Sequence, residues 1–90
     1  MSASAPITLT STDLRDRVED RLGAWIPDRL WNRAEAYARH KLDIYRERHP
    51  DATYYDDVYL VRLTADTVRE FDFEDHVNAI SRERIAAARA

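Results

Sequence analysis

The sequence predicts an all-α protein, a small four-helix domain with two long and two short helices. Apolar residues recur at steps of three and four positions along most of the chain, as the buried faces of helices do. Only one glycine and three prolines occur in 90 residues, and they lie where helix ends are expected. The length allows one domain, which we place at residues 10–90 after a flexible N-terminal tail at residues 1–9.

A first helix is expected near residues 12–22. Thr10 and Asp13 match the Ser/Thr-x-x-Asp/Glu capping pattern, and Gly23 can adopt the left-handed conformation that ends many helices. Between these signals the apolar residues recur at every fourth position: Leu14, Val18 and Leu22.

A second, long helix is expected between Pro27 and Pro50. Proline suits the first position of a helix, and the acidic Asp28 that follows is favoured by the helix dipole. The helix should contain about 22 residues and be about 33 Å long. Its apolar stripe is expected to consist of Leu30, Trp31, Ala34, Tyr37, Ala38, Leu42 and Tyr45.

A third helix is expected after Pro50, with Thr53 and Asp56 as its capping pattern. Two apolar stripes follow, so we expect this helix to be central and several of its residues to be in the core: Val58, Val61, Leu63 and Val68. The alternative is a β-strand at residues 58–63, whose β-branched and aromatic residues favour one. A single strand would have no partner in this sequence.

A fourth helix is expected to begin at Asp72, which can act as its N-cap. Its apolar residues are Val77, Ile80, Ile85 and Ala88, and the chain ends in the strongly helical AAARA.

The composition argues against an enzyme. With a single glycine the chain has no glycine-rich phosphate loop, no dinucleotide fingerprint and no nucleophile elbow. It has no cysteine, and His40, His49 and His76 are not spaced as metal ligands on one helix face. Asp56 and Asp57 point to different faces of a helix, so we interpret them as a cap and a surface charge. We therefore expect no catalytic residues, no cofactor and no metal site.

Neither a membrane nor a nucleic acid is expected as a partner. The chain has no signal-peptide pattern and no apolar run long enough to span a bilayer, so we expect a cytoplasmic protein. Its opening ITLTSTDLRDRV superficially resembles a ribbon-helix-helix start. However, Thr8 and Thr10 have no basic neighbour to contact phosphate, and the net charge is −3.

The segment at residues 51–76 combines eight carboxylates with five aromatic rings and only two arginines. Such a composition is typical of a surface that meets a basic protein, because rings supply contact area and carboxylates steer association. Alternatively, the tyrosines cover the core and extend only their hydroxyl groups to water. The predicted interaction residues form two groups: Tyr54, Tyr55, Asp56, Asp57 and Tyr59, and, about 25 Å away if the helix is continuous, Glu70, Asp72, Glu74 and Asp75.

Two family resemblances suggest functions. The runs TSTDLRDRVEDRLG, IPDRLWNRAEAYARHKLDIY and DDVYLVRLTADTVREF resemble, in their order, the helices of bacteriophage head-to-tail connector proteins. That resemblance implies a ring-forming adaptor of the virion that docks on a portal, without catalysis. The run HPDATYYDD is similar to the acidic, two-tyrosine surface of colicin-type immunity proteins. It implies the alternative, a small acidic antitoxin or immunity-type inhibitor that binds a basic protein.

Overall fold

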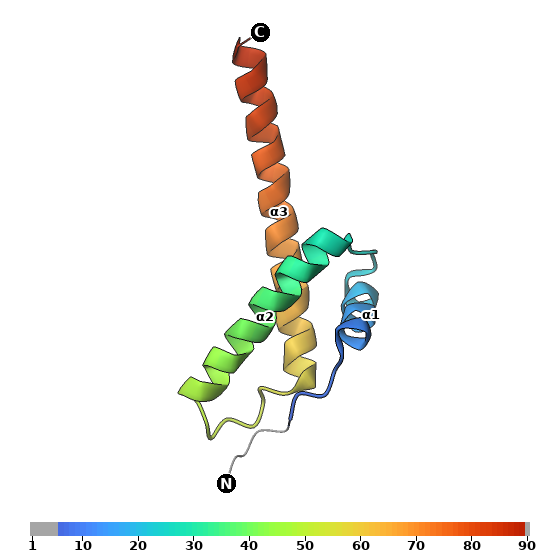
Figure 1. Ribbon diagram of the computed structural model, residues 1–90, viewed down its shortest axis with the longest axis vertical. Coiled ribbons are helices and arrows are strands. Elements are labelled where there is room, and N and C mark those ends of the chain that lie inside the picture. The colour runs from blue at the N-terminus through green and yellow to red at the C-terminus, as the bar shows by residue number, and fades with distance from the viewer. Residues whose placement is uncertain (1–5, 90) are drawn as a thin grey trace.

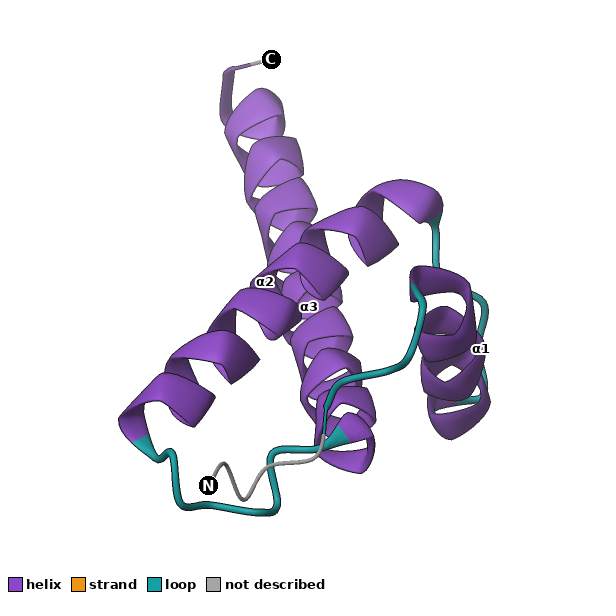
Figure 2. Cartoon of the chain, turned by 60° about the horizontal axis from the view of Figure 1, so that its bottom comes forward, coloured by secondary structure: helices purple, strands orange, loops and turns teal. Residues whose placement is uncertain are grey.

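The computed structural model describes residues 6–89, which form three α-helices: α1 (Ser11–Leu22), α2 (Asp28–Arg48) and α3 (Asp57–Arg89) (Figure 1). The predicted all-α class is confirmed. Residues 58–63 are helical and the described part of the chain contains no strand, so the strand alternative is wrong (Figure 2).

The predicted number of helices is wrong, because the expected third and fourth helices are one continuous helix of 33 residues. Asp72, expected to cap a new helix, lies inside α3 with its side chain exposed. The physical reason is that neither glycine nor proline occurs after Pro50. Nothing there removes a backbone hydrogen bond or favours a left-handed residue, so the helix continues.

Both ends of α1 agree with the sequence signals. The Thr10 hydroxyl accepts a hydrogen bond from the Asp13 amide at 3.2 Å. Gly23 has a φ of 67° and donates its amide to the Glu19 carbonyl at 2.8 Å. The turn to α2 is then held by the Glu19 carboxylate, which accepts a hydrogen bond from the Ile26 amide at 2.7 Å. These contacts fix the position at which α2 begins.

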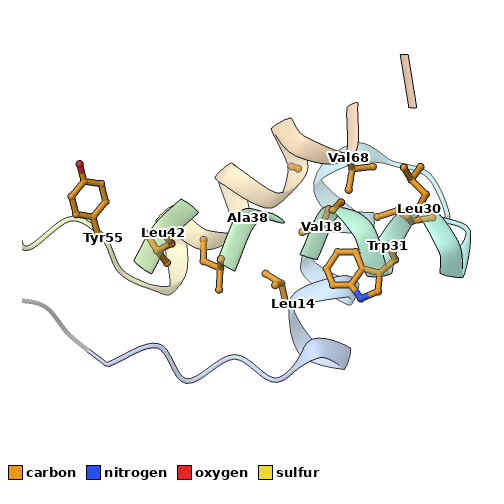
Figure 3. Packing of buried hydrophobic residues seen from close by; sticks show 12 residues of the cluster. Leu14, Val18, Leu30, Trp31, Ala38, Leu42, Tyr55 and Val68 are labelled. Atoms are coloured by element: carbon orange, nitrogen blue, oxygen red, sulfur yellow. The ribbon is translucent and has the colours of Figure 1, made fainter. Parts of the chain in front are cut away.

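The core lies where α1 and α2 pack against the first half of α3 (Figure 3). The predicted stripe of α2 is largely confirmed, although Tyr37 is exposed and Tyr45 is only half-buried. Trp31 is almost fully buried, and its indole nitrogen donates a hydrogen bond to the Ser11 hydroxyl at 3.1 Å. The buried apolar residues are Leu14, Val18, Ile26, Leu30, Trp31, Ala34, Ala38, Leu42, Tyr55, Leu60, Ala65 and Val68.

The prediction that Val58 of α3 belongs to the core is wrong, because this residue is 73% exposed. The helix begins only at Asp57, so Val58 lies in its first turn, and the buried face follows Leu60 and Val68 instead. Of the other predicted core residues, Val68 is buried, while Val61 and Leu63 are half-buried. Two threonines on this face, Thr64 and Thr67, are also buried, and their hydroxyls donate to the carbonyls four residues earlier, at 2.7 and 2.8 Å.

The second half of α3 extends away from the other two helices (Figure 1). We call residues 72–89 the arm and residues 6–71 the body. Every residue of the arm is exposed, and the molecule measures 63 × 26 × 16 Å. The base of the arm is held by Arg33 of α2, which lies 5.1 Å from the ring centre of Phe71 and pairs with Asp75 at 3.2 Å. None of the helices in the described residues is both long and apolar enough to cross a bilayer.

Candidate protein-interaction surfaces

The first predicted group of interaction residues surrounds a cluster of tyrosines at the start of α3. Tyr54 and Tyr55 were expected on the helix, but they lie in the loop that precedes it. The centre of the Tyr55 ring is 4.4 Å from that of Tyr54, 5.0 Å from that of Tyr59 and 5.7 Å from that of Tyr45. Tyr55 is 7% exposed and Tyr54 is 58% exposed. The cluster therefore covers one end of the core and presents the Tyr54 ring to solvent.

The hydroxyl of Tyr55 is held inside this cluster. It lies 3.4 Å from the Tyr54 hydroxyl. This hydrogen bond, together with burial, raises the pKa of Tyr55 to about 12. The Tyr55 phenol therefore holds its proton more tightly than an ordinary tyrosine does.

Asp56 and Asp57, which belong to the same group, both bind backbone groups of the body. The Asp56 carboxylate accepts the Tyr59 amide at 3.0 Å and caps α3. The Asp57 carboxylate accepts the Thr8 amide at 3.0 Å, the Thr8 hydroxyl at 2.6 Å and the Leu9 amide at 3.3 Å. Both carboxylates thus contribute to the internal structure at this end of the molecule.

The contacts of Asp57 shift its titration. Partial burial raises the pKa of this carboxyl, but the hydrogen bonds from Thr8 and Leu9, with the charge of Arg17, outweigh burial and hold the pKa below its usual value. The same contacts anchor residues 6–9, the last part of the expected tail, and Ile7 and Leu9 pack against the core. Residues 1–5 of that tail lie outside the described residues.

The second predicted group, Glu70, Asp72, Glu74 and Asp75, lies exposed where the arm leaves the body. Asp75 pairs with Arg33. Asp57 of the first group and Asp72 of the second both lie on α3, where they are separated by about 22 Å of helix length. The structure keeps the two groups apart, so they do not form one site.

A third surface, which the sequence interpretation did not single out, is an apolar face on the arm formed by Phe73, Val77 and Ile80. All three side chains are exposed, Phe73 by 68%. At about 100° of rotation per residue, they lie within roughly 60° of one another around the helix axis. Leu60, Thr64 and Val68, which face the core, lie on roughly the opposite side of the same helix.

The signal for this face was present in the sequence. Val77 and Ile80 were expected to be apolar residues of a last helix, and Phe73 stands four positions before Val77. The spacing of four and then three residues indicates one helix face. It does not indicate whether that face packs on the same chain, and the expected break at Asp72 would have allowed a last helix to fold back.

Residues 6–89 contain a sizeable groove but no cluster of the side chains that usually hold metal ions. Within that range, His, Cys, Asp and Glu side chains form no group of three that could hold a metal ion. A groove of about 360 Å³ lies between the start of α2 and the arm. Its polar lining consists of Arg29, Arg33, Asp72, Asp75, Asn78 and Arg82. These side chains include charges of both signs but no hydroxyl or thiol nucleophile.

Comparisons with protein-family models, with curated proteins and with solved structures found no match for this chain. The fold itself defines the class: a small all-α protein with a three-helix body and a projecting helical arm.

Proposed function

We propose that the chain is a non-enzymatic protein-protein interaction or assembly protein, and that the arm is its docking element. The observation that carries this proposal is the apolar face of the arm, Phe73, Val77 and Ile80, which points away from the core. Large apolar side chains grouped on an exposed helix face are typical of surfaces that bind another protein.

The energetics of the arm support the same function. Most helices in proteins gain their stability from the packing of an apolar face rather than from helix propensity. The arm has 18 residues, all of them exposed. Burying one large apolar side chain contributes about 1.5–3 kcal/mol, so a partner that covers all three would contribute several kcal/mol. A partner would therefore stabilise the arm as it binds.

A head-to-tail connector is the finer form of this proposal. In a ring, each subunit presents one surface to a different surface of the next subunit. The charges along α3 suit such a contact, because α3 is acidic where the arm leaves the body and basic at the end of the arm. The acidic residues are Glu70, Asp72, Glu74 and Asp75, and the basic residues are Arg82, Arg84 and Arg89.

The alternative is an acidic antitoxin or immunity-type inhibitor that binds a basic protein. The exposed ring of Tyr54, in a loop that also contains the exposed Asp51, favours this function. Tyr55, Asp56 and Asp57 contribute to internal contacts, so Tyr54 would be the principal anchor of such a surface.

An affinity capture from the native source, with matched variants, tests the proposal. One variant replaces Phe73, Val77 and Ile80 with serine, and the other is Tyr54→Ala; circular dichroism establishes that both fold. We expect the arm variant to lose the partner and Tyr54→Ala to retain it. The opposite result supports the inhibitor alternative, and capture that survives both variants contradicts the arm as the docking element.

A further inference from the structure

We propose that the arm binds the arm of a second copy of this chain, with the two helices antiparallel. This inference rests on the proposed function of the arm as a docking element and names its partner. The closed pair that it describes is an alternative to the ring contact of the connector form. It follows from the register of the apolar face, from the distribution of charge along α3 and from the part of α3 that the body leaves uncovered.

The arm has the register of a coiled-coil seam. Phe73, Val77, Ile80, Arg84 and Ala87 follow one another at alternating steps of four and three residues. This spacing keeps side chains on the contact line between two helices. In an antiparallel pair with its two-fold axis between residues 78 and 79, Val77 of each copy packs against Ile80 of the other.

The same register gives the charged seam residue Arg84 a partner. Arg84 of one copy lies opposite Phe73 of the other, where a guanidinium can stack on the aromatic ring. Glu70 of that other copy is one turn of helix away from Phe73 and can pair with the same Arg84. A charge on the seam, which would be costly opposite an aliphatic side chain, is therefore matched.

The charge distribution selects the antiparallel orientation. Residues 66–75 contain five carboxylates and one arginine, a balance of −4, whereas residues 82–89 contain three arginines and one glutamate, a balance of +2. Antiparallel helices place the acidic part of each copy beside the basic part of the other. Parallel helices would place the two acidic parts together, and such like-charge contacts are unfavourable.

The body leaves room for this arrangement. In the proposed register Arg89 of the second copy reaches the level of Val68. The face of α3 that continues the seam toward the body carries Arg62, Asp66 and Arg69, all of them exposed. These three side chains stay exposed even though the turn between α1 and α2 lies beside Arg69. The end of the second arm can therefore lie along this face while the two bodies remain at opposite ends of the pair.

Such a pair is isologous and closes at two copies. The seam is short, with about six positions in each copy, so we expect a dimer that dissociates on dilution. Sedimentation equilibrium from micromolar to millimolar concentration measures this. Ile80→Lys should weaken the dimer by at least about tenfold, because it places a charge at the centre of the seam. Asn78→Lys, which adds the same charge away from the seam, should leave the dimer unchanged.

Disulfide crosslinking tests the orientation, and the absence of cysteine from the chain makes single-cysteine variants unambiguous. The positions are Glu70→Cys and Ala87→Cys, which lie opposite each other in the antiparallel register and leave the central seam residues intact. After mild oxidation of a mixture we expect disulfides between the two variants. Disulfides within one variant should be rare, because its two cysteines would be about 25 Å apart along the pair, far beyond the roughly 7 Å that a disulfide spans between Cα atoms.

Three results would overturn this inference: a monomer at every concentration, a dimer that Ile80→Lys does not weaken, or disulfides mainly within one variant. The first would leave the proposed function intact if the serine variant of the arm still loses a captured protein. If that variant retains its partner and the chain is also monomeric, both proposals fail.

Discussion

The carboxylate of Asp57, at the start of α3, holds Thr8 through two hydrogen bonds, one from the Thr8 amide at 3.0 Å and one from the Thr8 hydroxyl at 2.6 Å. These residues are 49 positions apart in the sequence. The contact ties the segment that leads into α1 to the first turn of α3. It places Ile7 and Leu9 against the core and closes the end of the body opposite the arm.

Removing this contact should destabilise the body. We expect Asp57→Asn to lower the free energy of unfolding by about 1 kcal/mol, because asparagine keeps one acceptor oxygen but loses the charge that strengthens these hydrogen bonds. Urea denaturation measures the change. Asp56→Asn is the matched control, because asparagine caps a helix about as well as aspartate and should leave stability nearly unchanged.

The same carboxylate should make part of the unfolding free energy depend on pH. The pKa of Asp57 is lower in the folded protein than in the unfolded chain. The ionised carboxylate therefore stabilises the fold at pH values above its unfolded pKa of about 3.9. That contribution is lost as the pH falls through the lower, folded pKa. The difference in unfolding free energy between the native protein and Asp57→Asn should therefore shrink below about pH 4. A constant difference down to acid pH would show that the charge of Asp57 is not responsible.

Two apolar residues near the start of α3 should respond differently to truncation. Leu60 is fully buried, and Leu60→Ala should cost about 2–5 kcal/mol through lost burial and a residual cavity. Val58 is mostly exposed, and Val58→Ala should change the unfolding free energy by less than about 0.5 kcal/mol. Thermal denaturation of both variants compares the two sites. Equal losses would place Val58 in the core and contradict this position of α3.

The left-handed backbone conformation of Gly23 should have a measurable effect on the stability of the protein. Its φ is 67°, and a Cβ atom added there would meet no atom within 4 Å, so backbone strain alone penalises a side chain. We expect Gly23→Ala to destabilise the protein by about 1 kcal/mol. Gly23→Asn should cost less, because asparagine tolerates this conformation better. If both variants are as stable as the native protein, the end of α1 does not depend on Gly23.

The first two helices could be predicted from the sequence because local signals set their ends. Thr10 caps α1 by accepting a hydrogen bond from the amide three residues later, and Gly23 ends the same helix. The prolines at positions 27 and 50 border α2. The start of α3 was harder to predict. Thr53 and Asp56 match a capping pattern, but Asp56 is itself the cap, and the helix therefore begins after the two tyrosines.

Long-range properties could not be predicted from the pattern. Asp72 is suited both to a helix cap and to an exposed position inside a helix, so the sequence did not show that α3 is continuous. The function of Asp57 as a ligand of Thr8 depends on a contact across most of the body. An apolar helix face indicates that something covers it, but it does not indicate whether the cover belongs to the same molecule.

The central claim is that the arm is the surface through which this protein binds its partner. The most direct test is amide hydrogen exchange, residue by residue, in the free chain at low concentration and in the complex captured from the native source. We predict that amides from Phe73 to Ile80 become much more slowly exchanging in the complex while those of the body core change little. If exchange in the arm is the same in both samples and protection appears instead around Tyr54, the claim is contradicted.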